Sequence, residues 1–430
     1  MTDEFVVLAN AEAETRGLPN LPLVKVPHPV GSISDARLQS LAESTIARIV
    51  EALTGGDVLA SDSAPFSATE SNGNGKASNF IPASPALAFK TLAERGWTDG
   101  LPVIPPTPEA VEEMIESSGF NRDELLGIIP PLNGRATVEK IAANAVMAGC
   151  LPAFFPVVVT ALKAMMQPSF NLNGIQTTTS NVTPLTIVNG PCRQALNINY
   201  ASNVLGQGWR ANATIGRAIR LILTNIGGAV PGVYDKSTLG QPAKYGFCIA
   251  ENEEENPWEP LHVEKGFAKE LSSVSVCGCT GVHIVVDMAS KEPKGIITTM
   301  AAAMAAGGSS NWVYGCECLI IMCPEHAAIF SDRGYSKEDV KRELFEKARL
   351  SFDKFSDENL ELIAKRRPRW FQVGGNRDVP IVDRPEDIWI IVAGGKGPKS
   401  AFVPSWIDVR MSTMQIAVEG ELAAAVNCKC

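Results

Sequence analysis

Short apolar runs alternate with amphipathic helical segments through most of the chain, and this alternation limits the fold more than any other feature. The candidate strands span residues 184–190, 244–250, 273–279, 283–287, 317–323 and 387–395. Segments with helical spacing of apolar residues occur at residues 84–97, 137–150, 154–167, 212–228 and 294–308. Strands that alternate with helices pack as layers around a shared core. The sequence therefore predicts an α/β fold.

A stretch without apolar periodicity divides the chain into two unequal parts. Residues 57–79 are rich in Gly, Ser, Asn and Asp, which is typical of a flexible linker. Before them, a strand predicted at 21–30 and a helix predicted at 34–56 form a unit too small to bury a core alone. After them, residues 80–430 are long enough for a larger mixed α/β domain. We expect a small strand–helix piece joined by this linker to the larger domain.

Composition disfavours several classes of partner. The formal net charge of −9 argues against nucleic acid and anionic membranes, because both attract clustered Lys and Arg. The acidic first residues lack the pattern of a signal peptide, and the longest apolar run is interrupted by Pro152, Pro156 and Lys163. We therefore expect a cytoplasmic protein. In that reducing compartment, its ten cysteines are expected to be free thiols, metal ligands or redox groups.

Three Cys-x-Cys pairs are the strongest chemical signal in the sequence. Residues i and i+2 of a strand point to the same face, so each pair can present two sulfurs to one point. Thiolates bind Zn, Cu(I), Ni(II) or iron–sulfur clusters. The predicted ligands of a metal ion or iron–sulfur cluster are Cys277, Cys279, Cys316, Cys318 and Cys323. A redox-active dithiol and plain core packing are the two other interpretations of these cysteines.

Two histidines and the C-terminal cysteines are the candidate catalytic groups. His283 and His326 follow the paired cysteines, and we expect them to donate protons or act as outer ligands. Cys428 and Cys430 flank Lys429, whose positive charge favours the thiolate. This tail pair either exchanges thiols or closes the metal site, and an inert tail is the alternative.

Candidate anion-binding residues lie in two further segments. Arg210 and Asn212 stand near the start of a predicted helix, whose free N–H groups favour a carboxylate or phosphate. Lys396 lies in a glycine-rich turn whose spacing departs from that of a P-loop. We expect these residues to bind a small anionic substrate, with a capped helix and an ordinary turn as the structural alternatives. The chain contains no serine-nucleophile elbow, no H-E-x-x-H motif and no G-x-G-x-x-G motif after a strand.

Several longer motifs resemble a known family. The motifs GWTDGLPVIPPT, NGRATVEKIAANAVMAGC, IAENEEENPWEPLHVEKGF and IIVAGGKGPKSAFVPS resemble a bacterial domain that accompanies the UGSC-motif (seleno)protein family, over nearly all of residues 85–405. The segment AEAETRGLPNLPLVKVPHPVG is similar to the carboxy-terminal end of the UGSC-type domain itself, so residues 1–56 resemble a fragment of that domain. The family is in turn similar to component B of glycine and betaine reductases, whose Sec or Cys attacks carbon–heteroatom bonds.

This chain departs from the family pattern in two ways. It has no U/C-G-S-C segment, so the resemblance implies that a UGSC-type domain on a separate chain supplies the nucleophile in a heteromer. Ordinary members carry other residues where this chain has its five predicted cysteine ligands, which implies a metal site gained by a subgroup.

The expected function combines these signals. We expect a subunit of a metal–thiolate or iron–sulfur enzyme, an oxidoreductase or lyase, that acts on a carbon–heteroatom bond of a small anionic molecule. The cofactor would be an iron–sulfur (Fe–S) cluster or a Ni, Cu or Zn ion. A metal-free dithiol oxidoreductase or transferase subunit and a non-enzymatic metal-binding scaffold for the UGSC-type partner are the alternatives.

Overall fold

Within residues 1–31 and 33–54, the N-terminal segment carries two α-helices and no strand. The computed structural model describes residues 1–31, 33–54, 84–372 and 377–417. A short 3-10 helix, η1 (Asp3–Phe5), leads into α1 (Val6–Thr15), and α2 (Asp35–Thr54) follows. The prediction of a strand at 21–30 was wrong, because this segment makes only an isolated bridge between Thr2 and Val26. Prolines without an N–H donor recur through it, and no neighbouring strand lies beside it.

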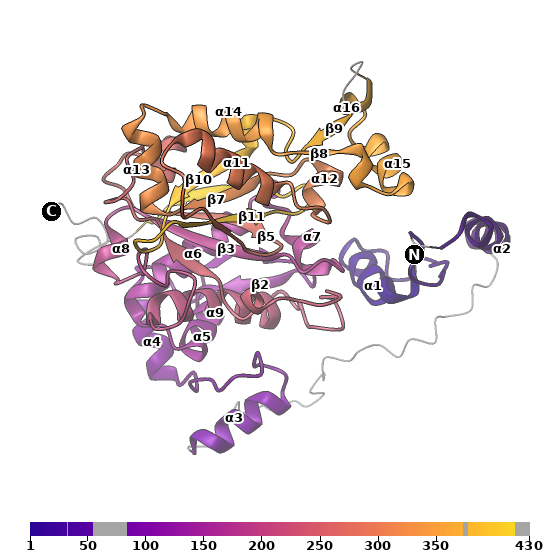
Figure 1. Cartoon of the computed structure of the whole chain (residues 1–430). Helices are drawn as coiled ribbons and strands as arrows, with labels where there is room; N and C mark the ends of the chain where they lie inside the picture. The colour runs from indigo at the N-terminus through magenta and orange to yellow at the C-terminus, as the bar shows by residue number, and fades with distance from the viewer. Residues whose placement is uncertain (32, 55–83, 373–376, 418–430) are drawn as a thin grey trace.

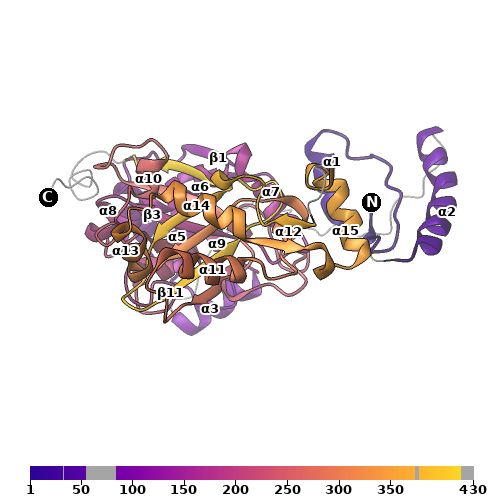
Figure 2. The same cartoon turned by 45° about the horizontal axis from the view of Figure 1, so that its top comes forward.

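The predicted helix at 34–56 is confirmed as α2, and its burial is unusual. None of its residues is buried, although its apolar residues recur at helical spacing. Leu38, Ile46, Ile49, Val50 and Leu53 are all exposed. At 3.6 residues per turn, these five positions fall on one face of the helix. Figures 1 and 2 show α2 at one side of the molecule, away from the sheets, with α1 between it and the main domain.

Two four-stranded sheets form the centre of the main domain. The first has the order β12-β5-β3-β4, with β3 (Thr183–Asn189), β4 (Cys248–Ala250), β5 (Ser273–Cys279) and β12 (Ser412–Gln415). The second has the order β10-β7-β11-β6, with β6 (His283–Val286), β7 (Cys318–Met322), β10 (Ile388–Val392) and β11 (Lys399–Pro404). Only the pairs β3–β4 and β7–β10 are parallel within these sheets. The mixed α/β fold class is therefore confirmed.

Helices flank the two four-stranded sheets, and several of them cover the outer faces. The longer ones are α3 (Pro85–Glu94), α4 (Pro108–Glu116), α5 (Val138–Ala148), α6 (Phe155–Met165), α9 (Arg210–Asn225), α11 (Pro293–Met304), α13 (Pro324–Asp332), α14 (Lys337–Lys347) and α15 (Asp357–Arg366). The shorter ones are α7 (Leu172–Thr177), α8 (Cys192–Ala195), α10 (Leu261–Glu264), α12 (Ser310–Tyr314) and α16 (Arg369–Gln372). Two strand pairs lie outside the main sheets: β1 (Leu125–Ile129) with β2 (Gly134–Thr137), and β8 (Arg349–Ser351) with β9 (Asp378–Pro380).

Three apolar clusters define four layers. Helices α5, α6 and α9 pack against the outer face of the first sheet through residues such as Val274 and Val276. Helices α11, α13 and α14 pack against the outer face of the second sheet through Ile320 and Ile390. The third cluster joins the inner faces of both sheets. The result is an α/β/β/α sandwich (Figure 1).

The helices of the described residues were compared with the length and hydropathy that a membrane span needs. Within the described ranges, no single helix is long and apolar enough to cross a membrane. The helix pair Pro152–Met165 and Pro168–Thr177, bent by 78°, meets the length and composition criteria only when its halves are combined. The domain boundaries predicted around 57–79 lie outside the described residues.

Candidate functional site

The carboxyl ends of the parallel strands of both sheets meet at one edge of the sandwich. The N–H of Asn252, just after β4, donates to the carbonyl of Val392 at the end of β10 (2.7 Å). The N–H of Ala393, just after β10, donates to the carbonyl of Met322 at the end of β7 (3.0 Å). The carboxyl ends of parallel strands are where α/β proteins place their ligand sites. Polar side chains that follow these strands are therefore the candidates for a ligand site.

Cys323 and His326 form a compact cluster at this edge. Cys323 follows β7 and caps the N-terminus of α13, so His326 lies in the first turn of that helix. The Nδ1 atom of His326 lies 2.8 Å from the Ser400 hydroxyl, and its Nε2 atom lies 3.2 Å from the carbonyl of Asp287. The same hydroxyl accepts the N–H of Cys323 (3.1 Å) and lies 3.5 Å from Sγ. Cys323 and His326 are each 1% exposed.

The hydrogen bonds of this cluster are consistent with a thiolate–imidazolium pair. Nε2 faces a carbonyl oxygen, so it must carry a hydrogen. If Nδ1 is also protonated, it donates to the Ser400 oxygen, and the Ser400 hydroxyl is then free to donate to the Cys323 sulfur. Every polar hydrogen of the cluster has an acceptor in that state, and the sulfur is the natural place for the balancing negative charge.

The pKa values of both groups move in the direction of this charged pair. Burial alone raises the pKa of the Cys323 thiol, but hydrogen bonds from His326 and Ser400 and the charge of His326 together lower it below its ordinary 9.0. Burial alone lowers the pKa of His326, but the hydrogen bond and charge of Cys323 and the Asp287 carbonyl raise it above 6.5. The position at a helix N-terminus also favours the thiolate.

The other described cysteines have the opposite behaviour. Burial raises the pKa of the Cys279 thiol to about 12. The same cause raises the pKa of the remaining six, which are Cys150, Cys192, Cys248, Cys277, Cys316 and Cys318. Among the eight described cysteines, Cys323 alone has a pKa below the ordinary value.

One cysteine of each described Cys-x-Cys pair, Cys277 and Cys318, lines the same small pocket, but the two belong to different apolar clusters. Cys277 and Cys279 belong to the cluster between the two sheets, whereas Cys318 belongs to the outer cluster beneath α11 and α14. Across residues 1–31, 33–54, 84–372 and 377–417, no group of three or more His, Cys, Asp or Glu side chains is placed to hold a metal ion. The predicted C-terminal pair, Cys428 and Cys430, lies outside the described residues.

The predicted substrate residues and His283 are dispersed. His283 begins β6, is exposed and lines a pocket of about 320 Å³ with Thr280. Arg210 begins α9, and its Nε donates to the carbonyl of Gly149 (3.0 Å). The side chain of Asn212 is buried and bonds the backbone of Asn199 and Cys248, so both of its N–H donors serve the fold.

Lys396 is the predicted substrate residue whose loop contacts the helix turn of the Cys323 cluster. It is exposed in the loop between β10 and β11. The N–H of the next residue, Gly397, donates to the Glu325 carboxylate in the first turn of α13. This contact places the loop beside the helix turn that carries Cys323 and His326.

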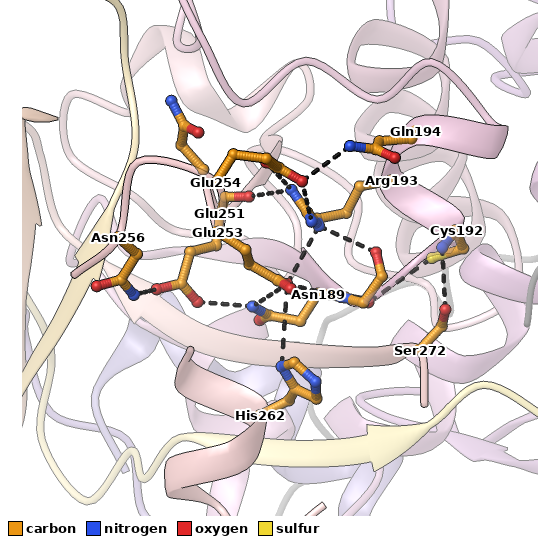
Figure 3. A network of polar contacts seen from close by, with 12 residues as sticks. Asn189, Cys192, Arg193, Gln194, Glu251, Glu253, Glu254, Asn256, His262 and Ser272 are labelled. Atoms are coloured by element: carbon orange, nitrogen blue, oxygen red, sulfur yellow. Dashed lines mark hydrogen bonds and ion pairs between the residues drawn. The ribbon is translucent and has the colours of Figure 1, made fainter. Parts of the chain in front are cut away.

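Sequence reasoning missed a second polar cluster at the same edge, which Figure 3 shows. Glu251, just after β4, is fully buried and accepts from Asn189 at the end of β3 (2.6 Å) and from the Leu261 N–H (2.8 Å). Arg193 holds Glu254 through two hydrogen bonds of 3.0 and 3.1 Å. Burial raises the pKa of Glu251. The acidic run ENEEEN at a strand end was the available signal, but its composition equally suits a solvated face.

A third group in this cluster is a buried histidine. His262 is fully buried, and burial lowers its pKa. Its Nδ1 lies 3.9 Å from the Glu253 carboxylate and has no hydrogen-bond partner among the described residues. Glu253 also accepts from the Asn189 side chain and the Gly190 N–H. These contacts hold the ends of β3 and β4 together beside β10.

Comparison with known proteins bears on the N-terminal segment. Residues 1–55 match the UGSC family, and a search of curated proteins found no match. The matched segment contains α1 and α2 and agrees with the resemblance seen in residues 11–31. The match ends before the main domain, so the resemblance of residues 85–405 to the accompanying domain remains an expectation. What is established is that residues 1–55 are similar to the UGSC family.

Proposed function

We propose that this chain is a subunit of a thiol-dependent enzyme in which the Cys323 thiolate is the nucleophile. The reaction class is lysis or group transfer at a carbon–heteroatom bond of a small molecule. The observation that carries the proposal is the contrast among the eight described cysteines: only one has a lowered pKa, and it is the one paired with a histidine at a helix N-terminus. Perturbed groups of this kind concentrate at functional sites.

The chemistry of the site follows from its two protonation partners. The Cys323 sulfur, having given its proton to His326, attacks an electrophilic carbon, and a new S–C bond forms as the carbon–heteroatom bond breaks. The His326 imidazolium donates its proton to the departing heteroatom. Ser400 hydrogen-bonds both groups and fixes the orientation of the ring. The S–C bond is later broken by water or by an acceptor group.

Access to the sulfur requires local movement, since Cys323 and His326 are both 1% exposed. The loop between β10 and β11 is the neighbouring segment, held to the first turn of α13 by the contact of Gly397 with Glu325. Gly394 and Gly397 have φ angles of 101° and 141°, a backbone conformation that residues other than glycine rarely adopt. The exposed Lys396 in this loop is the group we assign to an anionic substrate.

The metal–thiolate enzyme remains a prediction beside this proposal. No three of its cysteines within the described residues are placed to hold a metal ion, so it needs ligands from the C-terminal pair or from another chain. Elemental analysis of anaerobically purified protein tests it. A near-stoichiometric metal that is lost in a Cys277→Ser/Cys316→Ser variant would support it, and protein free of metal would exclude it.

The partner we propose is a UGSC-type domain on a separate chain, docked on the exposed apolar face of α2. That face lies in the segment matched to the UGSC family, and nothing in the described residues covers it. Mixing the full chain with a separately produced UGSC-type chain tests this partner. Ile49→Asp should abolish co-elution, whereas Glu51→Gln on the opposite side of the helix should leave it intact. Co-elution that survives Ile49→Asp would exclude this docking face.

The proposed function is tested by trapping the nucleophile in the full chain. Brief treatment with iodoacetamide at neutral pH, followed by peptide mapping, should label Cys323 before any other described cysteine. Cys318→Ser, at the start of the strand that precedes Cys323, should not change this labelling, and His326→Gln should suppress it. Labelling of Cys323 no faster than that of Cys318 would contradict the proposal and favour the scaffold interpretation.

A further inference from the structure

A cavity at the opposite end of the first sheet contains an arginine without a carboxylate partner. The cavity has a volume of about 600 Å³, which lies in the range of small-ligand pockets, roughly 300–1,000 Å³. Arg220 on α9 lines it, and its guanidinium donates to the Lys244 carbonyl (2.8 Å) and to the Thr183 hydroxyl (2.9 Å). Among the described residues, no carboxylate forms an ion pair with Arg220. A largely buried charge without an ionic partner is costly to the fold.

The neighbouring charges are already paired with one another. Lys244 donates to both carboxylate oxygens of Asp235, at 2.8 and 2.6 Å. Asp99, which also lines the cavity, accepts two hydrogen bonds from Arg217 outside it. Of the described charged side chains that line the cavity, Arg220 alone forms no ion pair, and the charge of Asp235 acts on it only at longer range.

The rest of the lining sets the shape of the ligand. Apolar groups make up most of the wall, including Pro231, Leu239 and Tyr245, and the last two are exposed at the surface. Thr224, one helical turn after Arg220, adds a hydroxyl on the same face of α9. A guanidinium surrounded by apolar wall suits a ligand with one negative charge and an apolar body.

We propose that this cavity is a binding site for a small organic carboxylate, with the carboxylate on Arg220 and the apolar body against Leu239 and Tyr245. A phosphate is the less suitable ligand, because its second negative charge would have no partner in the cavity. The site is distinct from the Cys323 cluster: Arg220 contacts Thr183 at the start of β3, whereas that cluster lies at the carboxyl edge. It does not depend on the proposed thiol chemistry.

Calorimetry and thermal unfolding of the full chain test the site with defined probes. Sodium butyrate and sodium benzoate should bind saturably and raise the unfolding temperature, whereas butyramide, the neutral counterpart of butyrate, should do neither. Arg220→Lys keeps the charge but loses the planar fork, and should weaken butyrate binding by about tenfold or more. Arg342→Gln, an exposed arginine on α14, should bind butyrate like the unmodified chain.

A second variant covers the case in which Arg220→Lys does not fold. Thr224→Leu fills the cavity without removing a hydrogen bond of the described structure, and it should also weaken butyrate binding. Three results would overturn the proposal: butyramide binding as well as butyrate, inorganic phosphate as the only ligand bound, or butyrate binding unchanged in the variants. Absence of saturable binding by both carboxylates would overturn it as well.

Discussion

Cys323 and the pair Cys277–Cys279 are all buried thiols within or just after a strand, yet the pKa of Cys323 is lowered and the pKa values of the pair are raised. The pair lies inside β5, where backbone groups are used in ladders with β3 and β12 and the side chains meet apolar neighbours. Cys323 lies one residue beyond β7, where a helix begins. There the sulfur meets a histidine one turn on and a serine from the next strand. Burial dominates the pKa values of Cys277 and Cys279, whereas hydrogen bonds and charge dominate the pKa of Cys323.

The largest expected difference between these regions is reactivity. The pKa of Cys279 is about 12 and that of Cys323 is below 9.0, so their thiolate fractions at neutral pH differ by about 10³-fold or more. Peptide mapping after timed iodoacetamide treatment should show Cys323 alkylated much faster, by a factor smaller than this ratio because a thiolate of lower pKa is less nucleophilic. Local opening acts in the same direction, because strand interiors open less readily than strand ends. Comparable rates would remove the distinction between the two regions.

Removing the histidine should make Cys323 resemble Cys279. In His326→Gln, burial is no longer opposed by the imidazole, so the pKa of Cys323 should rise above its ordinary value. The thiolate fraction at neutral pH should fall by about tenfold or more. The matched control is His283→Gln, at an exposed position on β6, which should leave the alkylation rate unchanged. An equal fall in both variants would contradict the pairing.

Asp287 contributes stability on the Cys323 side with a defined pH dependence. Hydrogen bonds from Thr299, Ser290 and Ala289 outweigh burial and lower its pKa from 3.8 to about 2. A depressed carboxyl pKa stabilises the fold above pH 3.8, and this contribution is lost as the pH falls toward 2. Asp287→Asn should therefore cost about 2 kcal/mol in the free energy of unfolding at neutral pH. A cost that persists unchanged at the lowest pH would contradict this cause.

The smallest expected effect is the loss of stability when a cysteine of β5 is replaced. Cys279 is fully buried in the cluster between the sheets, so Cys279→Ala should cost about 1 kcal/mol in the free energy of unfolding through lost packing. The rate of Cys323 alkylation should not change. A large loss of bound metal or of thiol reactivity in this variant would restore a chemical role to the pair.

The sequence predicted the strands and helices of the main domain well because local periodicity encodes them. Strands at 184–190, 273–279 and 317–323 appear as β3, β5 and β7 with small changes at their ends. The pairing of strands into two stacked sheets was not predicted, because β12–β5 and β10–β7 join residues far apart in the chain. Proline-rich residues 21–30 have strand-like composition, but they lack a partner strand.

The candidate site was predicted in part for the same reason. Cys323 and His326 stand three residues apart on one helix turn, a spacing visible in the sequence. Ser400 and the Asp287 carbonyl come from the start of β11 and the end of β6, and only the antiparallel register of these strands brings them together. The i, i+2 rule correctly placed Cys277 and Cys279 on one face, but a shared face determines neither ionisation nor convergence with a second pair.

The ionisation of Cys323 in the folded chain tests the central claim most directly. The ultraviolet absorbance of thiolate, recorded against pH as the difference between the unmodified chain and Cys323→Ser, isolates this sulfur without requiring access to it. The account predicts a difference titration with its midpoint below pH 9.0, moved upward in His326→Gln. A midpoint at or above 9.0, insensitive to His326, would contradict the account.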